Sequence, residues 1–310
     1  MVPMFYLELN NYSKAFSIQS WYHSIRHKTK LDSAYAIGKL FNPDEYLPGS
    51  NRSNKWYNYE AGKHKPSVKL INHIDMLYPG TRQWIYHPLW TLLNQKKVPQ
   101  KSLYEIVSNI RPKLAKHFSD INTFNYHKRS YSLHNPKTID ALFKQGDMNS
   151  LIMLFSIMRD AENKNNKLQF DEAARASIFN LYIVLQQEPL FSIRHDLFKY
   201  ISEYIYSKSD HLFIGAFPRS VKLDITFSHI RTAFNLAASH NLVTSYNDYG
   251  AFLYWLWRED IIYLSGEIKP DFIKISSLMN RIELESNIYK KEYENPREAL
   301  TDNFRVMFEV

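Results

Sequence analysis

A short segment near the N-terminus gathers the kinds of side chain that proteins use to contact DNA. Asparagine and serine side chains hydrogen-bond to base edges, and lysine and arginine contact phosphates or guanine. Such residues are concentrated between positions 52 and 58, and lysines follow shortly after. The candidate DNA-binding residues are Arg52, Ser53, Asn54, Lys55, Tyr57, Asn58, Lys63, Lys65 and Lys69. This composition predicts an element that contacts bases while the basic residues around it fix its position.

The aromatic residues of the same segment predict a helix that would present these side chains. Trp56 and Tyr59 are three residues apart, so they share one face of a helix and can both enter a core. Gly62 stands where this helix would end and suits the left-handed C-cap conformation. A second helix is expected to begin at Pro66-Ser67. Its predicted apolar positions are Val68, Leu70, Ile71, Ile74 and Leu77.

The run Tyr59-Glu60-Ala61-Gly62-Lys63-His64-Lys65-Pro66 resembles the Cro/repressor-type helix-turn-helix family, the xenobiotic-response-element regulators. In that family the recognition helix ends in an aromatic or aliphatic residue, Glu, any residue, Gly and a basic residue, and Pro follows two residues later. The resemblance covers about residues 25–80. It implies that the segment 52–60 enters the major groove of duplex DNA.

The resemblance also implies a preceding helix from Ser33 to Phe41, with Ala36, Ile37, Leu40 and Phe41 as its apolar positions. The family joins the two helices by a short turn. Here residues 42–51 intervene instead, and they include two prolines and a glycine. This insertion is where the sequence departs from the family pattern.

Positive charge is concentrated in the front part of the chain. The formal net charge is +8, and it divides into +11 for residues 1–130 and −3 for residues 131–310. This asymmetry predicts that the front part faces a polyanion. The candidate backbone contacts are Lys96, Lys97, Lys128 and Arg129. The last two lie in the run Tyr126–Tyr131, which is either a loop that follows the nucleic-acid backbone or a solvated linker.

Three aromatic residues, Trp84, Tyr86 and Trp90, follow the helix-turn-helix block. They are either a surface on which bases stack or a plug that joins the DNA-binding part to the rest of the protein.

Composition indicates an all-α protein of 310 residues that can bury a large core. Glycine occurs only 8 times, which argues against an all-β fold and against a phosphate-cradling enzyme. The chain has no cysteine, so it has no disulfide and no thiolate zinc site. No apolar run approaches the ~18 residues that span a bilayer, and the N-terminus lacks the basic start of a secretion signal. We therefore expect a cytoplasmic protein without membrane contact.

The expected domains are a helix-turn-helix domain over residues 1–95, a basic linker or helix over 96–135 and a helical body over 136–310, for assembly or partner binding. Asp171 is the expected N-cap of one body helix. The other expected body helices are Thr138–Gln145, Phe191–Tyr206, Val221–Ala238, Tyr249–Leu264 as a central buried helix, and one from Pro270 to Tyr293.

No established catalytic motif is present, and no cofactor or metal is expected. The spacing of Arg and His in HEPN ribonucleases occurs three times, at Arg82/His87, Arg111/His117 and Arg129/His134, against about 1.6 matches by chance. Acidic pairs such as Asp171-Glu172 are better explained as helix caps or solvated faces.

These observations favour a sequence-selective DNA-binding protein, most simply a transcriptional regulator that binds as a dimer. The second hypothesis is a DNA- or RNA-binding structural subunit of a phage-defence or mobile-element complex. The third is a HEPN-like ribonuclease toxin.

Overall fold

The computed structural model describes residues 11–48, 53–94, 96–112 and 136–209. Every regular element in these ranges is a helix, which confirms the all-α prediction. The helices predicted at Val221–Ala238, Tyr249–Leu264 and from Pro270 lie outside the described residues. Within those residues, no helix combines the length and apolar character needed to cross a membrane.

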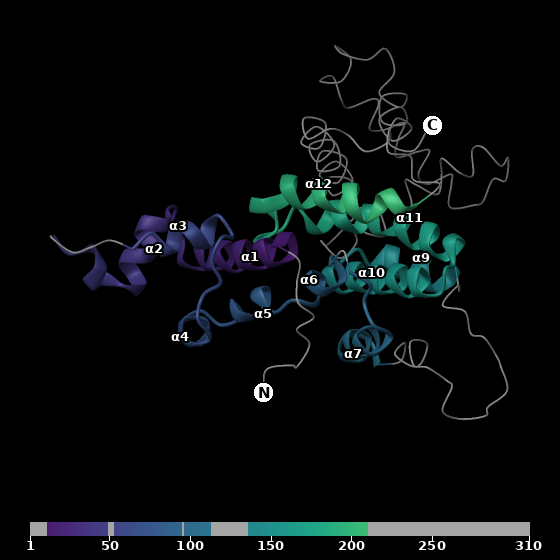
Figure 1. Cartoon of the computed structure of the whole chain (residues 1–310), viewed down its shortest axis with the longest axis horizontal. Coiled ribbons are helices and arrows are strands. Elements are labelled where there is room, and N and C mark those ends of the chain that lie inside the picture. Colours follow the sequence, from purple (N-terminus) through teal and green to yellow (C-terminus); the bar gives the residue numbers. More distant parts are fainter. Residues whose placement is uncertain (1–10, 49–52, 95, 113–135, 210–310) are drawn as a thin grey trace, which may run out of the picture.

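The first helix, α1 (Asn11–Thr29), connects two groups of helices, as Figure 1 shows. The helices α2 to α5 form one group, here called the head, and the helices α6 to α12 form the other, here called the body. Phe16 of α1 packs into the body core, whereas Trp21 and Tyr22, about one turn further on, pack into the head core. The aromatic residues of α1 therefore contribute to both cores.

The head consists of α2 (Ala34–Phe41), the short 3-10 helix η1 (Pro43–Tyr46), α3 (Lys55–Glu60), α4 (Val68–Leu77) and α5 (Arg82–Ile85). Its core consists of Ile18, Trp21, Tyr22, Ile25, Ala34, Ile37, Trp56, Tyr59, Ile71, Ile74 and Ile85. Helical spacing within α2 and α4 therefore predicted Ile37, Ile71 and Ile74 correctly.

Three of the apolar positions predicted for these helices are wrong. Leu40, Val68 and Leu77 are 46%, 52% and 55% exposed. On α2 the buried face is formed by Ala34, Ile37 and Gly38. Successive residues of a helix are rotated by about 100°, so Leu40 is turned away from this face.

The body consists of α6 (Pro88–Leu92), α7 (Gln100–Ile110), α9 (Pro136–Gln145), α10 (Met148–Asn163), α11 (Lys167–Val184), η3 (Phe191–Ile193), α12 (Arg194–Tyr204) and η4 (Tyr206–Lys208). The helix α10 is buried at every position from Ser150 to Ala161, and it packs along α11. It is therefore the central helix of the described body, whereas the predicted central helix Tyr249–Leu264 lies outside the described residues.

One predicted helix start in the body is wrong. Asp171 lies inside α11 and not at its N-cap, where Asn166 accepts a hydrogen bond from the backbone N–H of Gln169 at 3.1 Å. Asp171 is 4% exposed, and its carboxylate accepts a hydrogen bond from the Ser209 hydroxyl. An aspartate before an apolar run suits both a cap and a buried acceptor, and the sequence alone does not separate the two.

The two cores meet between α5 and α6. Ile85 belongs to the head core and Leu89 to the body core, while Trp84 packs against both. The residues from Leu89 to Leu93, which the sequence analysis placed in the first domain, thus pack with the body.

Candidate nucleic-acid interface

The helix α3 ends in a Schellman motif that fixes the chain after it. The N–H of Gly62 donates to the carbonyl of Tyr59 at 3.0 Å, and the N–H of Lys63 donates to the carbonyl of Asn58 at 2.8 Å. Gly62 has a φ of +69°, as predicted for a C-cap glycine. A Cβ at Gly62 would lie 2.9 Å from the carbonyl oxygen of Ala15 on α1. The same glycine therefore also permits the close approach of the turn to α1.

One face of α3 is anchored by aromatic packing. The Trp56 indole lies between Trp21, at a centroid distance of 6.2 Å, and Phe41, at 5.5 Å. Its Nε1–H donates to Oδ1 of Asn42 at 3.1 Å. Tyr59 meets Trp21 edge-on at 5.6 Å. Trp56 and Tyr59 are 0% and 7% exposed, which confirms the predicted helix phase.

The opposite face of α3 points to solvent. Asn54 is exposed, Tyr57 is 49% exposed, and Asn58 is half-buried. These side chains are turned away from Trp56 and Tyr59 because a helix separates its faces by rotation. Of the residues predicted to contact bases, these three are the ones on the outer face.

Ser53 and Lys55 are instead engaged by Glu45 of η1. The Ser53 hydroxyl donates to Oε2 of Glu45 at 2.5 Å, and the Lys55 ammonium forms an ion pair with Oε1 of the same carboxylate. The hydrogen bonds from Lys55 and Ser53 lower the pKa of Glu45. Sequence reasoning missed Glu45 because it lies in the insertion that the family pattern does not cover.

The basic residues predicted beside α3 lie on the surface. Lys63 and Lys65 are exposed in the turn after α3, and Lys69 is exposed in the first turn of α4. Ser67 caps α4 by accepting a hydrogen bond from the N–H of Leu70 at 3.2 Å. The Lys65 ammonium lies 6.0 Å from the ring centroid of Tyr86. Arg52 lies outside the described residues.

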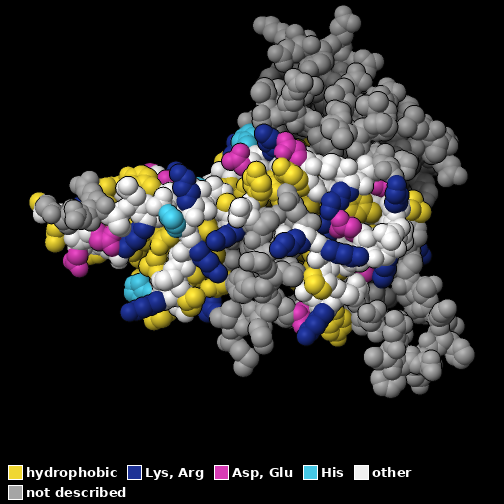
Figure 2. All heavy atoms as spheres, in the orientation of Figure 1, with side chains coloured by type: hydrophobic (Ala, Val, Ile, Leu, Met, Phe, Trp, Pro, Cys, Tyr) yellow, Lys and Arg dark blue, Asp and Glu magenta, His cyan; other side chains and the backbone are white. Residues whose placement is uncertain are grey.

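Lys96 and Lys97 are exposed but lie in another part of the molecule. They follow α6, whereas α3 lies at the other side of α1, well separated from α6 along the long axis in Figure 1. Lys128 and Arg129 lie outside the described residues. Figure 2 shows lysine and arginine side chains on both the head and the body, with hydrophobic side chains between them on the head.

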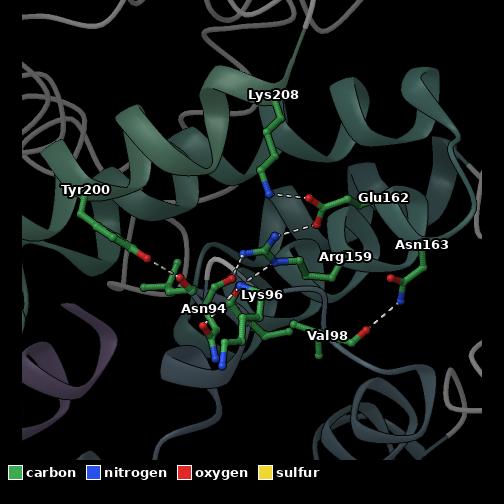
Figure 3. A network of polar contacts seen from close by, with 10 residues as sticks. Asn94, Lys96, Val98, Arg159, Glu162, Asn163, Tyr200 and Lys208 are labelled. Atoms are coloured by element: carbon green, nitrogen blue, oxygen red, sulfur yellow. Dashed lines mark hydrogen bonds and ion pairs between the residues drawn. The ribbon is translucent and has the colours of Figure 1, made fainter. Parts of the chain in front are cut away.

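The chain around Lys96 is held by a network centred on Arg159 of α10, which Figure 3 shows. Arg159 is 2% exposed and donates to the carbonyls of Leu92 and Asn94 at 2.7 Å and 2.6 Å. It also forms an ion pair with Glu162 at 2.6 Å. These contacts satisfy carbonyls at the C-terminal end of α6, where a helix leaves them without partners. The network therefore fixes the C-terminal end of α6 to α10 within the body.

Trp84 in the last helix of the head and Trp90 in the first helix of the body form a plug where the two cores meet. Trp90 is 1% exposed, and its Nε1–H donates to the carbonyl of Trp84 at 2.6 Å. The His87 ring lies parallel to the Trp84 ring at a centroid distance of 5.3 Å. Trp90 is therefore not accessible to bases, and its burial fits a plug between head and body better than a stacking surface.

The described residues contain no group of three His, Cys, Asp or Glu side chains that could hold a metal ion. Of the three Arg/His pairs with HEPN spacing, only Arg82/His87 lies wholly within the described residues. Arg82 lies 5.6 Å from the Tyr86 ring centroid, and burial lowers the pKa of His87 to about 4. His87 is half-buried, its Nδ1 is inaccessible to solvent and its ring stacks on Trp84, so it is packed as a structural residue.

No family model matches the sequence, and no curated protein or solved structure is significantly similar to it. The candidate interface is therefore defined by the geometry of α3 and its surroundings.

Proposed function

We propose that this protein binds duplex DNA through the outer face of α3, with Asn54, Tyr57 and Asn58 as the base-contacting residues. The observation that carries the proposal is the division of α3 into two faces. Trp56 and Tyr59 fix one face against α1 and α2, while the other presents two amides and a phenol to solvent. Amide side chains can form paired hydrogen bonds with adenine in the major groove.

The length of α3 supports binding as a dimer. A helix of six residues is about 9 Å long at 1.5 Å per residue, so it reaches only a few base pairs. Two copies related by a twofold axis would contact two half-sites and raise the specificity. A dimeric transcriptional regulator is the simplest protein of this kind.

Phosphate contacts would come from the exposed lysines that follow α3. Lys63 and Lys65 lie in the turn after it, and Lys69 lies in the first turn of the next helix. Phosphate contacts of this kind set the position of a recognition element and contribute affinity for any sequence.

The affinity for duplex DNA at several salt concentrations tests this proposal. With six or more phosphate contacts, the affinity should fall by ~10³ between 50 and 200 mM salt. The double variant Lys63→Gln/Lys69→Gln should reduce the slope of log K against log salt by about 1.8. Lys101→Gln on α7 is the matched control, because Lys101 is also exposed but lies on the body. A flat salt dependence, or equal slopes for all proteins, would contradict the proposal.

A second candidate is a nucleic-acid-binding subunit of a larger complex, for example one used in phage defence or by a mobile element. It is favoured by the way α1 contributes residues to both cores, which ties the head to a large helical body that could contact a partner. The two candidates differ in whether the isolated protein binds duplex DNA or requires RNA or another subunit first.

A further inference from the structure

The insertion between α2 and α3 places a carboxylate beside two hydrogen-bond donors at the start of α3. Glu45 of η1 accepts hydrogen bonds from the Ser53 hydroxyl and the Lys55 ammonium, which precede and begin α3. Both partners are side chains that proteins commonly use to bind phosphate oxygens. Glu45 thus occupies the hydrogen-bonding capacity that a DNA phosphate would otherwise use.

The packing of Tyr46 fixes the position of this carboxylate. Tyr46 covers Gly38 of α2 so closely that a Cβ at Gly38 would come within 1.9 Å of the Tyr46 hydroxyl oxygen. The Tyr46 ring also meets the Tyr35 ring edge-on at a centroid distance of 5.1 Å. Because Tyr46 is the next residue in the chain, its packing holds Glu45 beside α3.

The ion pair between Lys55 and Glu45 is nevertheless exposed enough for another anion to replace Glu45. The side chains of Lys55 and Glu45 are 30% and 29% exposed, so water reaches both. Ion pairs with this much exposure contribute little net stability, because solvent screens them. A phosphate that approaches α3 can therefore replace the carboxylate without disrupting the fold.

We propose that Glu45 competes with DNA phosphate for Ser53 and Lys55, so that η1 lowers the affinity of the α3 face for DNA. This inference rests on the proposed function. A carboxylate and a phosphate are both anions and repel each other at the same pair of donors. DNA binding would then require the ion pair between Glu45 and Lys55 to break. The affinity for DNA would depend on how strongly the carboxylate and the phosphate each bind these two donors. The hydrogen bonds that lower the pKa of Glu45 keep this carboxylate charged at neutral pH.

The test compares full-length wild-type protein with Glu45→Gln, which keeps the shape of the side chain and removes its charge. Glu45→Gln should bind duplex DNA about five- to tenfold more tightly at low salt. The slope of log K against log salt should steepen by about 0.9, because Lys55 becomes available to one more phosphate. Asp44→Asn is the matched control, since it removes the neighbouring exposed charge without touching Ser53 or Lys55.

A double variant shows whether the effect passes through Lys55. Lys55→Gln should abolish the gain in affinity that Glu45→Gln produces, and should weaken binding less in the wild-type background than in the Glu45→Gln background. Thermal unfolding of each variant checks that the fold is retained. If Glu45→Gln disturbs the fold, Lys55→Gln and Ser53→Ala in the wild-type background provide the second measurement, and both should then lower the affinity only slightly.

The inference is overturned if Glu45→Gln binds no more tightly than Asp44→Asn, or if its gain persists without Lys55. A loss of affinity in Asn54→Ala and Asn58→Ala, together with no change in Glu45→Gln, would leave the proposed function standing and refute the competition alone. If neither wild type nor any variant binds duplex DNA, both proposals are wrong.

Discussion

The indole of Trp56 on α3 lies parallel to the indole of Trp21 on α1, with ring centroids 6.2 Å apart and an interplanar angle of 12°. Six residues are too few for a helix to be stable by itself in water. The formation and orientation of α3 therefore depend on this stacking contact and on the packing of Tyr59 beside it. The face that α3 presents to solvent follows from which residues it buries.

Replacing Trp56 by Ala should destabilise the protein by on the order of 3–5 kcal/mol, because it leaves a large cavity between α1, α2 and α3. Urea unfolding followed by circular dichroism measures the change. Tyr57→Ala is the control, since Tyr57 is 49% exposed and should change the free energy of unfolding by less than about 0.5 kcal/mol. Equal effects of the two variants would contradict the assigned helix phase.

Substitutions at two glycines with positive φ distinguish the cost of backbone strain from the cost of a steric clash. Gly62 and Gly80 have φ values of +69° and +89°. A Cβ at Gly80 would meet its nearest atom at 3.6 Å, whereas at Gly62 it would lie 2.9 Å from the Ala15 carbonyl oxygen. We expect Gly80→Ala to cost about 1–2 kcal/mol through backbone conformation, and Gly62→Ala to cost clearly more.

The measurement is the denaturation midpoint of each glycine variant against wild type. If Gly62→Ala is no more destabilising than Gly80→Ala, the close approach of the α3 turn to α1 is absent in solution.

Removing the Arg159 side chain should destabilise the body strongly. Arg159→Ala leaves the buried carbonyls of Leu92 and Asn94 without a hydrogen-bond donor. It also removes one of the ion-pair partners of Glu162. We expect a loss on the order of 3 kcal/mol in the free energy of unfolding. Lys208→Ala removes the other, more exposed partner of Glu162 and should cost less than about 1 kcal/mol.

Thermal and chemical unfolding of these two variants give the comparison. A small effect of Arg159→Ala, similar to that of Lys208→Ala, would mean that the end of α6 is not held by this network.

The lowered pKa values of two histidines should make the free energy of unfolding depend on pH. Burial lowers the pKa of His87 to about 4, and burial together with the nearby Arg26 charge lowers that of His23 to about 4. In the unfolded chain both titrate near 6.5. As pH falls from 6.5 to 4, the unfolded state takes up protons that the folded state does not. The contribution of these histidines to the free energy of unfolding is therefore complete above pH 6.5 and is lost as the pH falls to 4.

The measurement is the free energy of unfolding at several pH values between 7 and 4.5, above the range in which carboxylates with lowered pKa values titrate. The variant His23→Gln/His87→Gln should show a flatter profile than wild type. A wild-type profile that is already flat between pH 6.5 and 4.5 would contradict the burial of both rings.

Local patterns predicted the anchored face of the candidate site well. The spacing of Trp56 and Tyr59, the position of Gly62 and the burial of Ile71 and Ile74 depend on neighbours a few residues apart, and the structure has them as predicted. Periodicity thus identifies which face of a helix is buried.

Contacts between distant residues were not predictable in the same way. Glu45 meets Lys55 across an insertion, Arg159 meets the end of α6 from 65 or more residues away, and Asp171 meets Ser209. Such pairs depend on how the helices pack, and a single sequence records no pairing between them. Leu40 shows a different limit, since an apolar side chain need not be buried and the rotation of about 100° per residue turns Leu40 away from the buried face of α2.

Selection of duplexes from a random library with the full-length protein, followed by titration of the enriched duplex, shows whether the outer face of α3 contacts DNA bases. Wild type should enrich a defined sequence, and Asn54→Ala and Asn58→Ala should each weaken binding to it by about 1–3 kcal/mol. The exposed Asn109 on α7 provides the control variant Asn109→Ala, which should bind as wild type does. Enrichment of no sequence, or unchanged affinity in both α3 variants, would contradict the account.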